Sequence, residues 1–384
     1  MTSKSPAPPR SILVVCIRLI GDVILSTPLL GLLKSAWPEA RIDMLVGRGT
    51  GEFIEKDPRV RRVLYADTGE SGGEGGTRRN TYLRAIFRQY DLSVNLNASD
   101  RGNIASALAG RRTRVGFYSG VNWWKDGWKK ILLTHPVRFP YAIHVARVGQ
   151  LAAEALGLSV PRLEARVFWD RDDEETVEAL LRSRGVSRPY FVVHPFARWK
   201  YKFWKTERFA ETSDLVTERR GLQPVWTSSP DPGEVGLLQE TAALCRRTPA
   251  LLAGALSLNQ MACLLAGSSL YVGLDTAVSH IAATTGVPMV VLYGPTIAER
   301  WSPWRNDGPV AQQCPLPRGT QRVGKMVLIQ KDWKCVPCGR AGCDGKGGES
   351  PCLAAIGTAE VLEAVDEVLA AEVANPRETT GEGR

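Results

Sequence analysis

A short segment after the first apolar run of this chain carries residue types that suit proton transfer. Arg18-Leu19-Ile20-Gly21-Asp22 directly follows the buried-strand pattern of residues 12–17. A carboxylate held at the start of a helix by a tight glycine turn can act as a general base toward a hydroxyl group. An acid there also stabilises the helix dipole, by ~0.3–1 kcal/mol. The spacing leaves both interpretations of Asp22 open, with Arg18 and Gly21 predicted to lie in a cleft beside it.

A second segment, residues 273–280, follows another strand and opens a helix. Backbone N–H groups at a helix N-terminus bind anions, and small residues such as Thr276 and Ala277 let a diphosphate approach. Asp275 has the wrong sign for phosphate but can hold hydroxyl groups beside it. His280 lies one helical turn further, where it is either a ligand-binding residue or a buried histidine of the core.

The segment 194–204 mixes cations with aromatic residues and leaves the same predicted sheet edge as Asp275. A cation at the mouth of a cleft can clamp a phosphate group. A solvated basic loop with aromatic anchors is the alternative. We favour the clamp, with Arg198, Lys200 and Lys202 as the candidate cations, because of the shared sheet edge.

Four cysteines gather in a glycine-rich loop with the spacing C-x2-C-x4-C-x8-C: Cys335, Cys338, Cys343 and Cys352. Four thiolates so close in sequence could bind zinc or an iron–sulfur cluster. Free thiols and a redox pair are the alternatives, since stable disulfides are not expected in a reducing cytoplasm.

Alternating strands and helices must position these segments. Continuous β-branched runs predict buried parallel strands, and helical spacing predicts the helices between them. The strands are expected at 12–17, 41–46, 92–96, 114–117, 190–193, 224–227, 251–252, 270–272 and 289–293. The main helices are expected at 22–36, 142–156, 206–219, 233–244, 257–266, 277–285 and 358–372. Repeated β-α alternation indicates doubly wound sheets, which bind ligands beyond the carboxyl ends of their strands.

The alternation restarts after a crossover, so the fold class is α/β with two doubly wound domains facing each other across a cleft. The predicted parts are a disordered tail 1–10, a first domain 11–165, a second domain 166–357 with the Cys-rich loop 335–352, a helix 358–373 and a disordered tail 374–384. We expect the helix to lie back against the first domain, and residues 69–76 to form a mobile loop.

Composition indicates a globular chain with a basic first half. A hydrophobic fraction of 44% is ordinary for a soluble protein, and no apolar run approaches the ~18 residues of a membrane span. We expect a cytoplasmic protein. Most of the net charge of +9 lies in the first half, which favours phosphate-rich partners, but no nucleic-acid-binding motif is present. Residues 123–132 combine tryptophans with lysines, which predicts either peripheral contact with an anionic membrane or a packed loop.

Together these segments resemble glycosyltransferase family nine, the lipopolysaccharide heptosyltransferases, over residues 11–370. The late cysteines and Arg198-Trp199 are most similar to the heptosyltransferase III branch. The matching strings are 17–28, 193–195 with 202–204, 273–276 with 280, 293–296, and 300–301.

The resemblance implies a GT-B fold of two Rossmann-like domains. It implies that the second domain binds an ADP-heptose donor and that the first meets the lipid-linked inner core acceptor at the cytoplasmic face of the inner membrane. Transfer would invert the anomeric carbon without a catalytic metal or other required cofactor. By position, Asp22 would be the base and Lys202 would offset charge on the departing diphosphate. The implied donor-binding residues are Arg198, Thr227, Asp275, Thr276, Ala277 and His280.

Two departures keep alternatives open. Residues 227–232 stand where the family commonly has a glycine-rich loop, and Ala277-Val278 replaces the more usual Gly-Pro. A different nucleotide-sugar donor or acceptor on the same fold is therefore one alternative. A nucleotide-sugar-binding protein at the membrane without turnover is another, although the presence of both Asp22 and Lys202 favours an enzyme.

Overall fold

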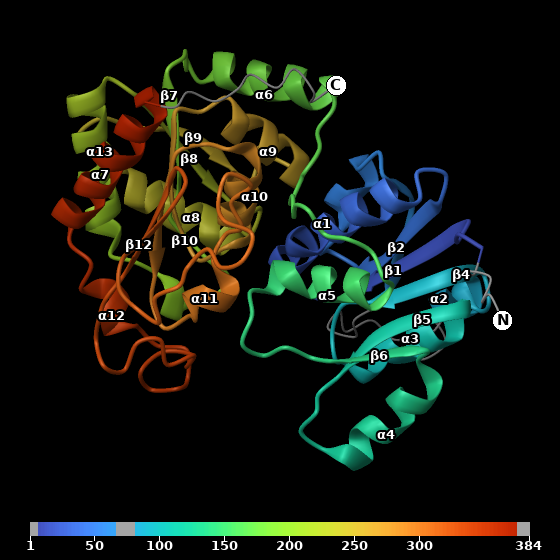
Figure 1. The fold of residues 1–384 in the computed structure, drawn as a ribbon. Coiled ribbons are helices and arrows are strands. Elements are labelled where there is room, and N and C mark those ends of the chain that lie inside the picture. The colour runs from blue at the N-terminus through green and yellow to red at the C-terminus, as the bar shows by residue number, and fades with distance from the viewer. Residues whose placement is uncertain (1–6, 67–80, 375–384) are drawn as a thin grey trace. The chain divides into compact units, whose positions relative to one another are not determined.

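The computed structural model describes residues 7–66 and 81–374 and divides the chain into two compact units, Met1–Ala165 and Arg166–Arg384 (Figure 1). The predicted loop at 69–76 and most of both predicted tails lie outside the described residues. No helix in the described part is long and apolar enough to cross a bilayer.

The first unit is built on a sheet of parallel strands in the order β3-β2-β1-β4-β5-β6. The strand order reverses between β1 and β4, which creates the kind of switch point where doubly wound folds bind ligands. The strands are β1 Ser11–Cys16, β2 Arg41–Gly47, β3 Val60–Ala66, β4 Tyr90–Asn95, β5 Gly110–Tyr118 and β6 His135–Arg138. The helices are α1 Ile20–Ala36, η1 Glu52–Lys56, α2 Thr81–Ile86, α3 Asp100–Ala109, α4 Trp123–Leu132, η2 Val145–Arg147 and α5 Val148–Ala155.

The central strands of this unit form because their sequences are apolar on both faces. Every residue from Ile12 to Cys16 is buried, as expected for a parallel strand covered by helices on both sides. The helix α1 begins at Ile20, two residues before the predicted start, and continues through Pro28.

The tryptophan-rich segment is a helix, α4, and Trp123 and Trp124 are exposed. The interpretation of this segment as a loop with core tryptophans is therefore wrong. Asn122 caps the helix, since its side chain accepts hydrogen bonds from the N–H groups of Trp124 and Lys125.

The second unit repeats the same plan with one added strand. Its sheet order is β12-β13-β11-β10-β7-β8-β9, parallel except for the β12–β13 pair. The order reverses between β7 and β10. The strands are β7 Tyr190–His194, β8 Gln223–Ser228, β9 Ala250–Ala253, β10 Leu270–Leu274, β11 Met289–Tyr293, β12 Gln321–Val323 and β13 Met326–Gln330. The helices are α6 Arg171–Ser183, η3 Lys200–Lys202, α7 Thr206–Arg220, α8 Pro232–Ala242, α9 Leu258–Ala266, α10 Ala277–Thr285, α11 Ala298–Trp301, α12 Pro351–Ala354 and α13 Thr358–Ala374.

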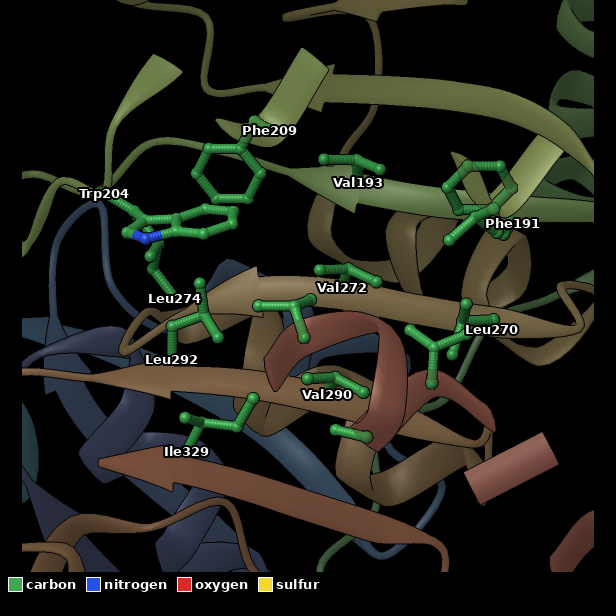
Figure 2. Packing of buried hydrophobic residues seen from close by; sticks show 14 of the residues in the cluster. Phe191, Val193, Trp204, Phe209, Leu270, Val272, Leu274, Val290, Leu292 and Ile329 are labelled. Atoms are coloured by element: carbon green, nitrogen blue, oxygen red, sulfur yellow. The ribbon is translucent and has the colours of Figure 1, made fainter. Parts of the chain in front are cut away.

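Alternate residues of the central strands form the core of this unit. Figure 2 shows side chains of β7, β10 and β11 packed together with Phe209 of α7 and with Trp204. The Trp204 indole N–H donates to the carbonyl of Ile356, 2.9 Å away. This bond ties the basic-aromatic segment to the core.

The last helix, α13, belongs to the second unit. Its residues Val361, Val365 and Val368 are buried in the core cluster of that unit, and α13 contacts α7, β11 and β13. The apolar face of this helix is therefore used by the core of the second unit, and its packing against the first unit stays a prediction.

Candidate active site

Asp22 lies at the carboxyl end of β1, in the first turn of α1. It is 9% exposed, and the Arg18 guanidinium Nε lies 3.4 Å from one of its carboxylate oxygens. The helix N-terminus and the Arg18 guanidinium both place positive charge beside this carboxylate. Burial and the charge of Asp22 raise the pKa of the neighbouring Cys16 thiol to about 12, so that thiol stays protonated. Asp22, Gly21 and Arg18 therefore lie together at the switch point of the first sheet.

The other strand of this switch point contributes an asparagine that the sequence analysis missed. Asn97 follows β4 and is 8% exposed, and its Oδ1 accepts the backbone N–H of Ser99 at 3.0 Å. Its Nδ2 is buried with no hydrogen-bond partner among the described residues. The available signal was a pair of amides, at 95 and 97, at the end of a predicted strand.

In the second unit, Lys202 and Asp275 form the centre of a polar network. The Lys202 ammonium lies 2.6 Å from the Asp275 carboxylate, with the side chains 19% and 9% exposed. The hydroxyl of Thr296 donates to the same carboxylate oxygen at 2.6 Å. Three segments that are distant in sequence thus meet beyond the carboxyl ends of β7, β10 and β11.

Thr296 and Gln330 are residues of this network that sequence reasoning did not assign. The Gln330 amide, at the end of β13, donates to the carbonyls of Gly294 and Thr296 at 2.7 and 2.9 Å. It thereby fixes the turn that aims the Thr296 hydroxyl at Asp275. The string 293–296 matched the family, and that match was the available signal.

The predicted anion site is the N-terminus of α10. Thr276 is the N-cap residue, and its side chain makes no capping hydrogen bond to the first N–H groups of this helix. Ala277, with its small side chain, is the first residue of the helix. The end of α10 thus offers backbone donors next to the Lys202–Asp275 pair.

His280 is buried within α10, and the charges of Asp275 and Lys202 both affect its pKa. Burial lowers the pKa of His280 to about 4, against a smaller opposite effect of Asp275. Its Nδ1 has no hydrogen-bond partner among the described residues. His280 is therefore a neutral ring beneath the polar network at neutral pH.

Thr227 supports a second buried histidine. It is fully buried at the end region of β8, and its hydroxyl lies 3.0 Å from His194 Nδ1. Burial lowers the pKa of His194 to about 4. Because the Thr227 hydroxyl is already bonded inside the unit, a part in donor binding would act through His194.

Arg198 lies in the loop between β7 and η3. Its guanidinium lies 5.0 Å from the ring centre of Trp199, and Trp199 in turn stacks near Tyr201, 6.5 Å between centroids. This arrangement places a cation and exposed aromatic surface on the same segment as Lys202.

The Cys-rich loop carries the four cysteines that the sequence predicted as metal ligands. Cys335, Cys338 and Cys343 are exposed free thiols, and Cys352 is buried. Across residues 7–66 and 81–374, no group of three or more His, Cys, Asp or Glu side chains is arranged to hold a metal ion. Burial raises the pKa of the Cys352 thiol, and the nearby thiols of Cys335, Cys338 and Cys343 raise it further. Metal binding by these four cysteines stays a prediction.

Two hydrogen bonds connect the same loop to the polar network. The N–H of Gly339 donates to the carbonyl of Pro295 at 2.8 Å, and the Ser350 hydroxyl donates to the carbonyl of Tyr201 at 2.7 Å. The loop thus supports both the turn that carries Thr296 and the segment that carries Lys202.

Chemically, the second unit presents a cation and helix N–H groups for an anion, with a carboxylate beside them for hydroxyl groups. The first unit presents a carboxylate at its own switch point. This set suits the binding of a sugar diphosphate and the removal of a proton from a hydroxyl group.

Comparisons with known proteins agree with this chemistry. The model of glycosyltransferase family 9 (heptosyltransferase) matches residues 81–321, and the chain belongs to that family. It is a glycosyltransferase, as the motifs predicted. Lipopolysaccharide heptosyltransferase 3 of Escherichia coli K12 is 28% identical over 75% of this chain and 83% of its own length.

Two solved structures share the fold over nearly the whole chain. A family 9 glycosyltransferase from Veillonella parvula has a TM-score of 0.73 at 18% identity, covering 94% of this chain and 97% of its own. The E. coli ADP-heptose lps heptosyltransferase II has a TM-score of 0.68 at 22% identity, covering 94% and 99%. The predicted GT-B type fold, with two Rossmann-like units, is confirmed.

Proposed function

We propose that this family 9 glycosyltransferase moves heptose from ADP-heptose to the inner core of lipopolysaccharide, with inversion at the anomeric carbon. The single observation that carries the proposal is the Lys202–Asp275 pair at the N-terminus of α10, with the Lys202 ammonium 2.6 Å from the carboxylate. A cation, helix N–H groups and a hydroxyl-binding carboxylate are what a nucleotide diphosphate-sugar requires. We take the sugar heptose, the nucleotide ADP and the acceptor lipopolysaccharide from the E. coli relatives, a lipopolysaccharide heptosyltransferase 3 and an ADP-heptose lps heptosyltransferase II.

In the proposed reaction, Asp22 removes the proton from the attacking hydroxyl of the acceptor. The hydroxyl oxygen bonds to the anomeric carbon while the bond from that carbon to the diphosphate oxygen breaks. The charge left on ADP is met by Lys202 and by the N–H groups at Thr276 and Ala277. Preorganised donors at a developing charge are often a dominant catalytic contribution.

Donor recognition is proposed to involve Arg198, Asp275 and His280 as well. Asp275 is held by the Thr296 hydroxyl and so can accept hydroxyl groups of the sugar. His280, kept neutral by burial, adds no charge beside Lys202. Thr227 acts through His194, as its buried hydroxyl indicates.

We place the enzyme at the cytoplasmic face of the inner membrane, in peripheral contact with it. Its acceptor is lipid-linked in this proposal, and its first half carries most of the positive charge. An anionic lipid surface attracts such a face.

The test is transfer from ADP-heptose to purified lipid A-core acceptors of stepwise length, followed by mass spectrometry. We expect one acceptor to gain one heptose, and parallel reactions with other nucleotide-sugars to give none. If only a different nucleotide-sugar supported transfer, that nucleotide-sugar would replace ADP-heptose as the donor in the proposal. An absence of transfer from every donor would overturn the proposed reaction.

A further inference from the structure

The helix α4 is mounted on the first unit by its polar residues. Asp126 is 1% exposed. It accepts hydrogen bonds from the Ser119 N–H and hydroxyl at 3.1 and 2.9 Å, and from the Gly120 N–H at 2.8 Å. Burial would raise the pKa of Asp126, but these bonds and the charge of Lys129 lower it overall. The carboxylate is therefore a charged anchor and not a surface group.

Lys129 is the second anchor of this helix. It is 4% exposed, and its ammonium donates to the Ala98 carbonyl at 3.1 Å and pairs with Asp100 at 2.9 Å. A surface helix normally buries its apolar stripe and exposes its polar face. In α4 that arrangement is reversed, because the polar side chains of Asp126 and Lys129 are buried while Trp123, Trp124 and Ile131 are exposed.

Those apolar side chains form an exposed patch, which we call the α4 patch. Trp123 is 68% exposed, Trp124 74% and Ile131 81%. The two indole rings stack with centroids 3.7 Å apart, so they present one broad aromatic surface. Figure 1 shows α4 standing beyond the β6 edge of the first sheet. Clustered exposed apolar groups of this kind mark interaction sites.

The surroundings of the α4 patch are positively charged, which favours an anionic partner. Residues 110–140 contain several Lys and Arg but a single acid, Asp126, and that acid is buried. Lys125 and Lys130 are exposed on the helix itself. Interfacial tryptophans together with lysines suit the head-group region of an anionic bilayer.

A protein partner fits this patch less well. The helix has ten residues and is therefore about 15 Å long, so one face of it is far smaller than the ~800 Å² per partner of a stable protein interface. Lysine is also depleted in such interfaces.

We propose that the α4 patch docks the first unit onto an anionic lipid surface. This inference rests on the proposed function for the identity of the acceptor, but the docking itself is independent of turnover. The polar anchors hold the helix, the tryptophans enter the head-group layer, and Lys125 and Lys130 pair with lipid phosphates.

The test is co-sedimentation of the full chain with vesicles of phosphatidylglycerol and phosphatidylethanolamine, at low and high salt. An apolar variant combines Trp123→Ser, Trp124→Ser and Ile131→Ser. A charge variant combines Lys125→Gln and Lys130→Gln. We expect each variant to lower the partition coefficient by about tenfold or more, and high salt to weaken wild-type binding.

A matched control combines Leu244→Ser and Leu316→Ser, which are 52% and 51% exposed and lie in the second unit. We expect it to bind like the wild type, and all variants to keep the wild-type urea midpoint. Brominated lipid should quench wild-type tryptophan fluorescence more than that of the apolar variant.

Equal sedimentation of the wild type and the apolar variant would overturn the proposal. So would equal wild-type binding to vesicles of phosphatidylcholine alone, or self-association in sedimentation velocity that the apolar variant removes. Transfer to a deacylated, water-soluble acceptor separates the two proposals. We expect the apolar variant to keep that transfer and to lose transfer to the vesicle-bound acceptor. If the wild type transfers to neither, the proposed function fails while the vesicle result still decides the docking.

Discussion

Protonation of His280 should destabilise the second unit in mildly acidic solution. Burial lowers the pKa of His280 from 6.5 to about 4, so the unfolded chain takes up a proton before the folded chain does. Well above pH 6.5 the ring is neutral in both states and this effect is absent. As the pH falls from 6.5 through 4, the unfolded state gains protons first and the stability contribution is lost.

The size of the effect follows from the two pKa values. At pH 5 the ring is largely protonated in the unfolded chain and largely neutral in the native unit. The linkage relation then gives a loss of about 2 kcal/mol relative to pH 7.5, rising toward about 3 kcal/mol below pH 4. Such a loss is a substantial part of the 5–15 kcal/mol typical of a folded domain.

The assay is urea unfolding at pH 7.5 and pH 5 for the wild type and His280→Gln. The glutamine cannot titrate, so the variant should lose about 2 kcal/mol less than the wild type between these two pH values. If the two units unfold in separate transitions, the one whose midpoint His280→Gln changes at pH 7.5 is assigned to the second unit, which contains His280. His135→Gln, in the first unit, is the matched control and should leave the pH dependence of that transition unchanged.

An equal loss of stability for the wild type and His280→Gln would refute the reasoning. It would mean that His280 is solvated or paired in the native protein and not held neutral by burial. If His135→Gln reduced the pH dependence of this transition, His135 would contribute to it and the assignment to His280 alone would be wrong.

Three further predictions concern the site. Asp22→Asn should keep the fold and donor affinity but lower the initial transfer rate by about 10²–10⁴-fold, since the amide cannot accept the proton; a wild-type rate would reject Asp22 as the base. Lys202→Ala should weaken ADP binding in calorimetry and lower turnover about 10²-fold, whereas Lys205→Ala, whose lysine pairs with an exposed glutamate, should change neither; unchanged values for Lys202→Ala would remove Lys202 from the site. If the loop 335–352 binds metal, protein purified without chelator should contain stoichiometric zinc or iron by elemental analysis, and four titratable thiols with neither metal would reject the idea.

The central strands were predictable because parallel strands buried on both faces are continuous apolar runs. The boundaries of β11, Met289–Tyr293, and of the helix α10 agree with those expected from sequence. β3 was missed because Arg61 and Arg62 interrupt its apolar pattern. Both guanidiniums form ion pairs with Asp43 on the neighbouring strand β2, at 2.7 and 3.2 Å. The spacing of apolar residues along one strand cannot reveal such pairing between strands.

The site was predictable in part, because parallel strands end at a common edge of the sheet. That rule placed Asp22 and Asp275 after strands without any knowledge of tertiary contacts. It could not show that Thr296 donates to Asp275, or that Gln330 holds the turn of Thr296. These contacts join residues far apart in sequence, and side-chain pairing at that range is decided by packing. The orientation of α4 was equally hidden, because its buried pair, Asp126 and Lys129, looks like surface charge in the sequence.

The Lys202–Asp275 pair constrains how the proposed donor can enter. Within the Lys202–Asp275 pair each charge neutralises the other, and an unpaired charge at such partial burial would be costly. In the proposed function an incoming diphosphate would compete with Asp275 for Lys202. Asp275 can release that cation because the Thr296 hydroxyl still donates to it at 2.6 Å, and hydroxyl groups of a sugar can replace the ammonium. In the proposed binding step the one carboxylate would therefore pair first with Lys202 and then with the donor sugar, and Lys202 would become available to the diphosphate in the same exchange.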